Sequence, residues 1–195
     1  MNSKLLEFYK PFLEYIDSGK FFRTPFGWLY AVLAAFNLLV PLVILYIAID
    51  NRLFSMGGAF FFAFVILWVV IAAASWLGAQ IWWNRRQLLA AMTATDSDFV
   101  ATPVYAHFLQ TAGEWCGSWI AIVGAGAGLV SGIFLRDRGL DYMLPIPFLS
   151  AGGFLSVLLM PVVGFLIIIV SRVIAEQVRA LVAIAINTKR MKSAS

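Results

Sequence analysis

Four long windows of the sequence contain no Asp, Glu, Lys or Arg, and this feature limits the possible folds more than any other. The windows are residues 26–49, 57–83, 115–135 and 147–171. About 20 helical residues, rising about 1.5 Å each, are enough to cross the hydrocarbon core of a bilayer. Of the 195 residues, 62% are apolar, whereas soluble domains have about 45–50%. The sequence therefore predicts an all-α integral membrane protein with four transmembrane helices.

The placement of basic residues predicts the orientation of the chain, since Lys and Arg near span ends concentrate on the cytoplasmic side of a membrane. Eleven of the 14 lie in the two terminal segments and in the segment between the second and third windows. The other three are Arg52, Arg136 and Arg138, and the loops that carry them also contain Asp. We therefore expect a multi-pass protein of the cell (inner) membrane with both termini in the cytoplasm.

The windows and the residues between them divide the chain into five segments. We expect an N-terminal interfacial segment (1–24), a first transmembrane hairpin (25–86), a cytoplasmic amphipathic segment (87–114), a second transmembrane hairpin (115–171), and a cytoplasmic extension of the fourth helix with the tail (172–195). In the first segment, Leu5, Phe8, Phe12 and Ile16 recur at helical spacing. This stripe predicts an amphipathic helix that either lies in the membrane interface or packs on the chain's own cytoplasmic loop.

The two hairpins share a short sequence pattern. Ser55-Met56-Gly57-Gly58 recurs as Ser150-Ala151-Gly152-Gly153, 95 residues later. Two hairpins with the same orientation would form a parallel repeat, related by an axis near the membrane normal. The alternative is coincidence, because glycine is common in transmembrane helices.

Small residues recur along the third window. We expect helix packing at Gly117, Ala121, Gly124, Gly128 and Gly132, which are spaced three or four residues apart. Small side chains allow two helix backbones to approach closely, which matters in lipid because lipid provides no hydrophobic force between helices. The facing helix belongs either to this chain or to a partner.

One polar spot lies in the first window. Asn37 and Pro41 are four residues apart, so Pro41 lacks the backbone donor that would bond to the Asn37 carbonyl, and it bends the helix. The spot either forms part of a solute pathway or is a structural kink in which Asn37 bonds to a neighbouring helix. We favour the kink.

The residue pattern gives little support for a catalytic or cofactor-binding site. Asp96, Asp98, His107 and Glu114 match no zinc or calcium spacing, and His107 is the only histidine in the chain. No histidine lies in a window, which argues against haem, and Cys116 has no second cysteine with which to form a disulfide. We expect no catalytic, cofactor or metal site, and no nucleic-acid partner, because the basic residues form no binding motif.

The last helix is unusually apolar for a segment that has left the membrane. Residues 178–186 carry one charge, Arg179, and exposing such a surface to water is unfavourable. Arg172, Glu176 and Arg179 are spaced so that ion pairs are able to form along one face. We expect a docking surface formed by Arg172, Glu176, Arg179, Ala180, Ile184 and Asn187. It would be covered by the central segment, by the N-terminal helix or by a partner protein.

These features support two functional hypotheses. The first is a non-catalytic subunit of a larger membrane assembly, such as a transporter, secretion or respiratory complex, acting by helix packing and cytoplasmic docking. Its partners would be the lipid bilayer and other membrane subunits or a second copy of the chain. The alternative is a small homo-oligomeric transporter or channel for a neutral or lipidic solute, with Asn37 and the glycine face near the pathway. The absence of charge from the windows argues against proton-coupled transport.

Overall fold

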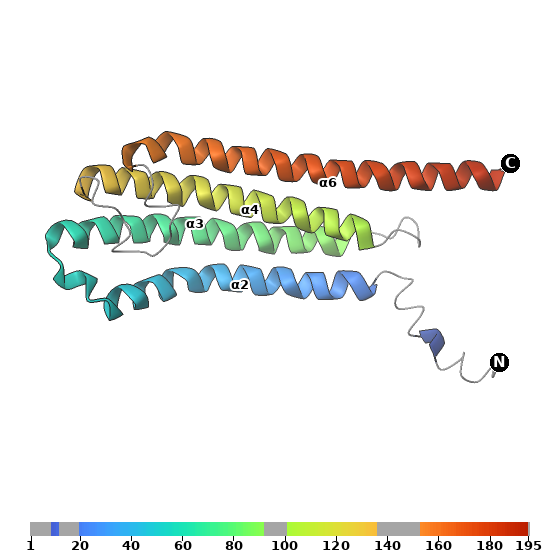
Figure 1. The fold of residues 1–195 in the computed structure, drawn as a ribbon. Helices are drawn as coiled ribbons and strands as arrows, with labels where there is room; N and C mark the ends of the chain where they lie inside the picture. Colours follow the sequence, from blue (N-terminus) through green and yellow to red (C-terminus); the bar gives the residue numbers. More distant parts are fainter. Residues whose placement is uncertain (1–8, 12–19, 92–100, 136–152, 195) are drawn as a thin grey trace.

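The structure, a computed structural model, describes residues 9–11, 20–91, 101–135 and 153–194, and its elements are helical. The long helices are α2 (Lys20–Asp50), α3 (Gly58–Ala91), α4 (Ala101–Val130) and α6 (Ser156–Ala194) (Figure 1). Short helical turns flank them at Leu53–Ser55, Ser131–Leu135 and Gly153–Leu155, of which the second is a π-helical turn.

Within the described residues, four helical stretches are long and apolar enough to cross a membrane. They are Arg23–Asp50, Gly58–Ala91, Ala101–Leu135 and Gly153–Lys192. Large apolar side chains such as Phe36, Val69 and Leu158 cover the outside of the bundle. Such a surface fits a hydrocarbon environment and would be unfavourable in water. The four helices therefore suggest a multi-pass membrane protein.

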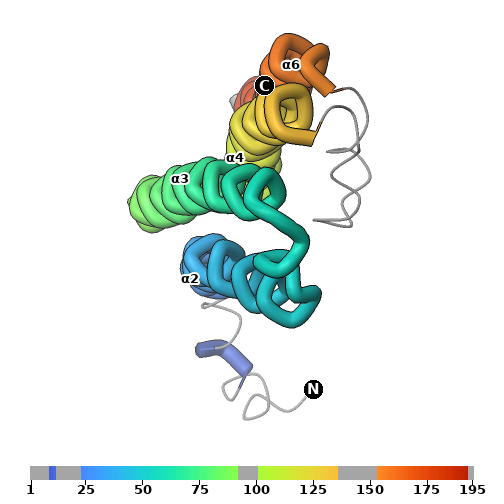
Figure 2. The backbone as a smooth tube through the Cα atoms, turned by 90° about the vertical axis from the view of Figure 1, so that its left-hand side faces the viewer, coloured from blue at the N-terminus to red at the C-terminus, as the bar shows by residue number. Residues whose placement is uncertain are grey.

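The four long helices follow one another in space in the order of the chain. α2 packs on α3, α3 on α4, and α4 on α6. Figure 2, which looks along the helices, shows this row, with α2 and α6 at its two ends. α6 is the longest helix, and it continues well past the ends of the other three (Figure 1).

The glycine ridge of α4 explains its close contact with α6. A Cβ atom on Gly117 would meet the Gly164 backbone, one on Gly124 would meet Met160, and one on Gly132 would lie 3.2 Å from the Phe154 ring. The remaining contacts of the predicted ridge are Ala121 with Gly164 and Gly128 with Gly153 and Ser156. The facing helix thus belongs to the same chain. Backbones so close require residues without large side chains, which is why the ridge consists of glycine and alanine.

Helices α3 and α4 extend further than the apolar windows. α3 continues to Ala91, and α4 already begins at Ala101, so residues 87–91 and 101–114 prolong the two helices. Pro103 lies in the first turn of α4, where its missing N–H disturbs no helical hydrogen bond.

Two sequence predictions fall largely outside the described residues. Of the N-terminal segment 1–24, the structure describes only residues 9–11 and 20–24. In the repeated pattern, Ser150, Ala151 and Gly152 also lie outside the described residues.

Candidate functional site

A buried carboxylate joins three helices in the half of the bundle where α4 begins. Glu114 of α4 is 8% exposed and pairs through Oε2 with the Arg85 guanidinium of α3. Its Oε1 accepts hydrogen bonds from Arg172 Nε and Nη2 of α6 at 3.1 and 2.8 Å, and from Gln110 Nε2 at 3.0 Å. A carboxylate removed from water needs such charged donors. We call Arg85, Gln110, Glu114 and Arg172 the Glu114 cluster.

The chain places these charges together because each lies at the end of an apolar stretch. Arg85 follows the second window, Glu114 precedes the third, and Arg172 follows the fourth. Because α3, α4 and α6 are aligned in the row, their stretches end at one level. The cluster contains two arginines and one carboxylate and so has a net positive charge.

A second polar group connects α2 to α4. The Tyr30 hydroxyl lies 2.8 Å from His107 Nδ1 and donates to Thr111 Oγ1 at 3.3 Å. The Tyr30 ring is fully buried and packs edge-on against Trp82 of α3. His107 Nε2 is buried and has no hydrogen-bond partner among the described residues. This group is a packed polar contact between helices, and His107 is part of it.

Asn37 and Pro41 of α2 both bond to neighbouring helices. Asn37 is 1% exposed. Its Oδ1 accepts a 2.8 Å bond from Trp115 Nε1 of α4, and its Nδ2 donates to the Leu33 carbonyl. The Pro41 carbonyl accepts a bond from Trp68 Nε1 of α3 at 2.9 Å. The predicted polar spot is therefore engaged in contacts between helices.

The predicted docking residues of α6 separate into two groups. Arg172 binds Glu114, and Arg179 Nη2 donates to Gln110 Oε1 at 2.7 Å, so both arginines bond to α4. The others, Glu176, Ala180, Ile184 and Asn187, are exposed. Leu181, which is not among the predicted docking residues, is exposed beside them and has an exposed fraction of 67%.

The Glu114 cluster was missed by sequence reasoning, which grouped Glu114 with Asp96, Asp98 and His107. Asp96 and Asp98 lie outside the described residues. Within the described part, no three His, Cys, Asp or Glu side chains are placed to hold a metal ion. The available signal was the sign of the charges: one acidic and two basic residues directly flank apolar windows on three different helices.

Comparison with known proteins identifies one matching family model. Residues 119–193 match a model described as a domain of unknown function, DUF4282. The match covers the end of α4 and nearly all of α6, including Arg172 and Arg179, and it begins after Glu114. No curated protein and no solved structure matches this chain.

Proposed function

We propose that this protein is a non-catalytic subunit of a larger assembly in the cell (inner) membrane and that the projecting part of α6 is its docking element. The observation that carries the proposal is the exposed apolar surface on α6 beyond Arg179. Leu181, Ile184 and Met191 are each more than 60% exposed. Their spacing of three and seven residues places them on one face of the helix.

None of the described helices covers this face of α6 beyond Arg179. Fifteen residues follow Arg179 in α6, which corresponds to about 22 Å of helix at about 1.5 Å per residue. Burying apolar surface stabilises by about 25 cal/mol per Å². A helix that presents spaced apolar anchors binds readily in a groove or against another helix.

The Glu114 cluster fixes the orientation of α6 relative to α4. Arg172 and Arg179 attach α6 to α4 on both sides of Glu176, directly before the exposed stripe. A docking helix held in place before binding loses less conformational entropy on association. The attachment to α4 therefore favours a mode of binding in which α6 docks on a partner as a rigid helix.

The test is the mass and composition of the assembly extracted from native membranes in mild detergent, measured by native mass spectrometry. The Leu181→Gln/Ile184→Gln double variant should lose the companion subunits that the parent retains in a fixed ratio. Ala183→Gln, an exposed position off the stripe, is the matched control and should retain them. If the double variant retains the same companions in the same ratio, the docking role is wrong.

A cysteine at Ile184 in a Cys116→Ala background identifies what covers the stripe. Crosslinking to an unrelated membrane subunit supports the proposal directly, whereas crosslinking to a second copy makes the chain its own partner. A pure homo-oligomer that survives the double variant would instead favour the alternative, a small transporter or channel.

A further inference from the structure

A groove runs along the contact between α2 and α3. Its walls in the middle of the helices are mainly apolar and surround a hollow of about 290 Å³. The apolar lining includes Ala31, Ala35 and Leu38 of α2 and Trp76 and Ala79 of α3, and the polar Gln80 and Asn84 of α3 also line the hollow. The hollow exists because alanine side chains leave space that the exposed Trp76 ring does not fill. Such a stripe of small residues is common in membrane helices and does not by itself identify a ligand.

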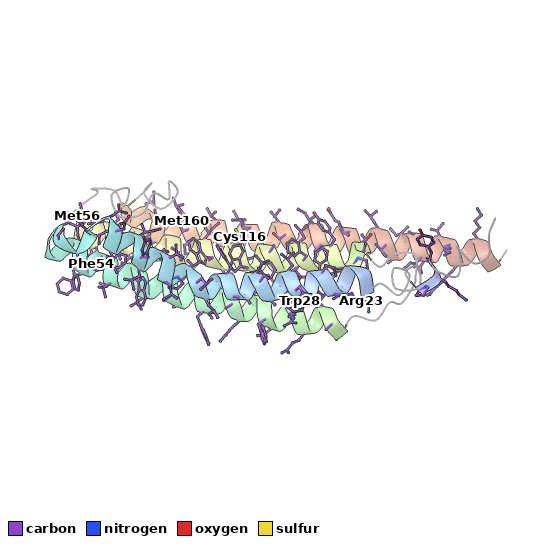
Figure 3. The ribbon with its side chains drawn as sticks, turned by 90° about the horizontal axis from the view of Figure 1, so that it is seen from below. Arg23, Trp28, Phe54, Met56, Cys116 and Met160 are labelled. Atoms are coloured by element: carbon purple, nitrogen blue, oxygen red, sulfur yellow. The ribbon has the colours of Figure 1, made fainter. Side chains whose placement is uncertain are left out.

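The end of this groove is cationic. A second hollow, of about 490 Å³, is lined by Arg23, Thr24 and Trp28 of α2 and by Arg86 of α3. Figure 3 shows Arg23 and Trp28 near the start of α2. The Arg86 guanidinium lies 5.3 Å from the centre of the Trp83 ring, and Trp83 lines the apolar hollow.

The two hollows are neighbours along the helices. On α2, Trp28 of the cationic hollow is one turn before Ala31 of the apolar hollow. On the antiparallel α3, Arg86 is one turn after Trp83. The residues along the groove therefore change from apolar to cationic within about one helical turn.

Arg23 and Arg86 differ from the arginines of the Glu114 cluster in their surroundings. Arg85 and Arg172 pair with Glu114, whereas Arg23 and Arg86 have no ion pair among the described residues. The described residues that line the two hollows include no Asp or Glu. A guanidinium group binds phosphate strongly, often through two parallel N–H···O hydrogen bonds. The cationic end thus has the charge that a phosphate group requires.

We propose that this groove binds an anionic membrane lipid, with the lipid phosphate between Arg23 and Arg86 and one acyl chain along Ala31, Ala35 and Leu38. From Arg23 to Leu38 the helix rises about 22 Å, which is enough for a headgroup and the half-thickness of about 15 Å that one leaflet contributes to the hydrocarbon core. Exposed Trp28 and Trp83 lie beside the arginines, as tryptophan does at the membrane interface. A free phosphate ion would use the cationic end alone.

The experiment uses the full chain, stripped of lipid in detergent and titrated with phosphatidylglycerol or with phosphatidylcholine of the same acyl chains, with bound lipid counted by native mass spectrometry. The parent should bind one phosphatidylglycerol in preference to phosphatidylcholine. Arg23→Gln/Arg86→Gln should weaken that binding about tenfold or more, given the usual attraction of basic residues to anionic lipid. Arg23→Lys/Arg86→Lys, which keeps the charge, should retain most of it.

Two controls distinguish this site from a general effect of charge. Arg52→Gln removes a charge at the other end of the α2–α3 pair and should leave the affinity unchanged. An equal melting temperature for parent and variants shows that folding is intact. If Arg23→Gln/Arg86→Gln binds phosphatidylglycerol as tightly as the parent does, the proposal is wrong.

A second pair of variants tests the acyl-chain part. Ala35→Phe fills the groove and should weaken phosphatidylglycerol binding, whereas Ala59→Phe adds the same volume at an exposed position near the start of α3, far from the hollow, and should not. If Ala35→Phe has no effect and inorganic phosphate displaces the lipid, the cationic end binds free phosphate and the lipid proposal is wrong. All of these measurements use the isolated chain, so their outcome is independent of the docking role of α6.

Discussion

At the scale of single residues, three buried polar side chains connect helices of the bundle. Glu114 connects α4 to α3 and α6, Tyr30 connects α2 to α4, and Asn37 accepts from Trp115. Such groups are costly to bury without partners, and with partners they specify which helices lie together. Removing one hydrogen-bond partner of a buried polar group should therefore lower the free energy of unfolding more than removing an exposed polar group does.

The first prediction concerns Glu114. Glu114→Gln removes the negative charge and leaves the Arg85 and Arg172 guanidinium groups facing a neutral amide. The free energy of unfolding should fall by about 1.5–3 kcal/mol, the range for hydrogen bonds to charged groups, and the melting temperature in detergent should fall with it. Glu176→Gln, at an exposed position on α6, is the control. Equal melting temperatures for the two variants would contradict a structural role for the cluster.

The second prediction concerns the buried amide of Asn37. Trp115→Phe removes the indole donor and leaves Asn37 Oδ1 without that hydrogen bond, at a cost of about 1–3 kcal/mol for an unsatisfied buried group. Trp76→Phe makes the same chemical change at a ring that is 58% exposed and should be nearly neutral. Thermal unfolding in one detergent compares the two variants. A larger loss for Trp76→Phe would show that the interior contact is unimportant.

At the scale of secondary-structure elements, the closest helix contact is the one between α4 and α6. Glycines on both helices make it: Gly117 on α4 and Gly164 on α6 lie so close that a side chain on either would meet the backbone of the other. The lower exposed fraction of the middle of α4 compared with that of α6 follows from this arrangement, because α4 contacts α3, α6 and, to a smaller extent, α2, whereas α6 packs mainly on α4.

The third prediction uses two glycines in helices. A Cβ atom on Gly128 would lie 2.7 Å from the Gly153 carbonyl oxygen, whereas a Cβ atom on Gly27 would meet nothing within 4 Å. Gly128→Ala should lower the melting temperature by forcing α4 and α6 apart. Gly27→Ala should leave it unchanged or raise it, since alanine favours a helix by about 1 kcal/mol over glycine. If both substitutions changed the melting temperature in the same direction, the result would argue against the close contact at Gly128.

At the scale of the whole molecule, the charges are distributed unevenly between the two ends of the bundle. Arg23, Arg85, Arg86 and Arg172 lie in the half of the bundle where α2 and α4 begin, and α6 projects beyond that end (Figure 1). At the other end, the described residues include Arg52 and Asp50. This asymmetry supports the proposed orientation, in which the projecting part of α6 is cytoplasmic.

The fourth prediction is the accessibility of single cysteines to an impermeant thiol reagent, in a Cys116→Ala background. Reagent added outside intact cells should label a cysteine at Arg52 and miss one at Ser193. After the membrane is opened, both should be labelled, which shows that both thiols can react. The opposite pattern in intact cells would reverse the orientation and place the α6 extension outside.

The length of the apolar stretches and their lack of charge were enough to predict the helices, because a long apolar helix satisfies its own backbone hydrogen bonds. The end of α3 at Ala91 and the start of α4 at Ala101 were not predicted, since those residues are amphipathic and their helical state depends on packing. The glycine ridge was predicted from its spacing. Its partner α6 was not, because lipid gives small residues no preference among the available helices.

Sequence alone therefore determined the helical class, the four apolar stretches and the small-residue face of α4, all of which depend on composition and spacing along one helix. The tertiary structure decided which helices are neighbours. That choice pairs Glu114 with Arg85 and Arg172, leaves Arg23 and Arg86 beside an apolar groove, and exposes Leu181 and Ile184. The physical reason is that each of these features joins residues from different helices or depends on where a neighbouring helix ends. Only the packing of the helices in space brings such residues within the reach of a hydrogen bond or an ion pair.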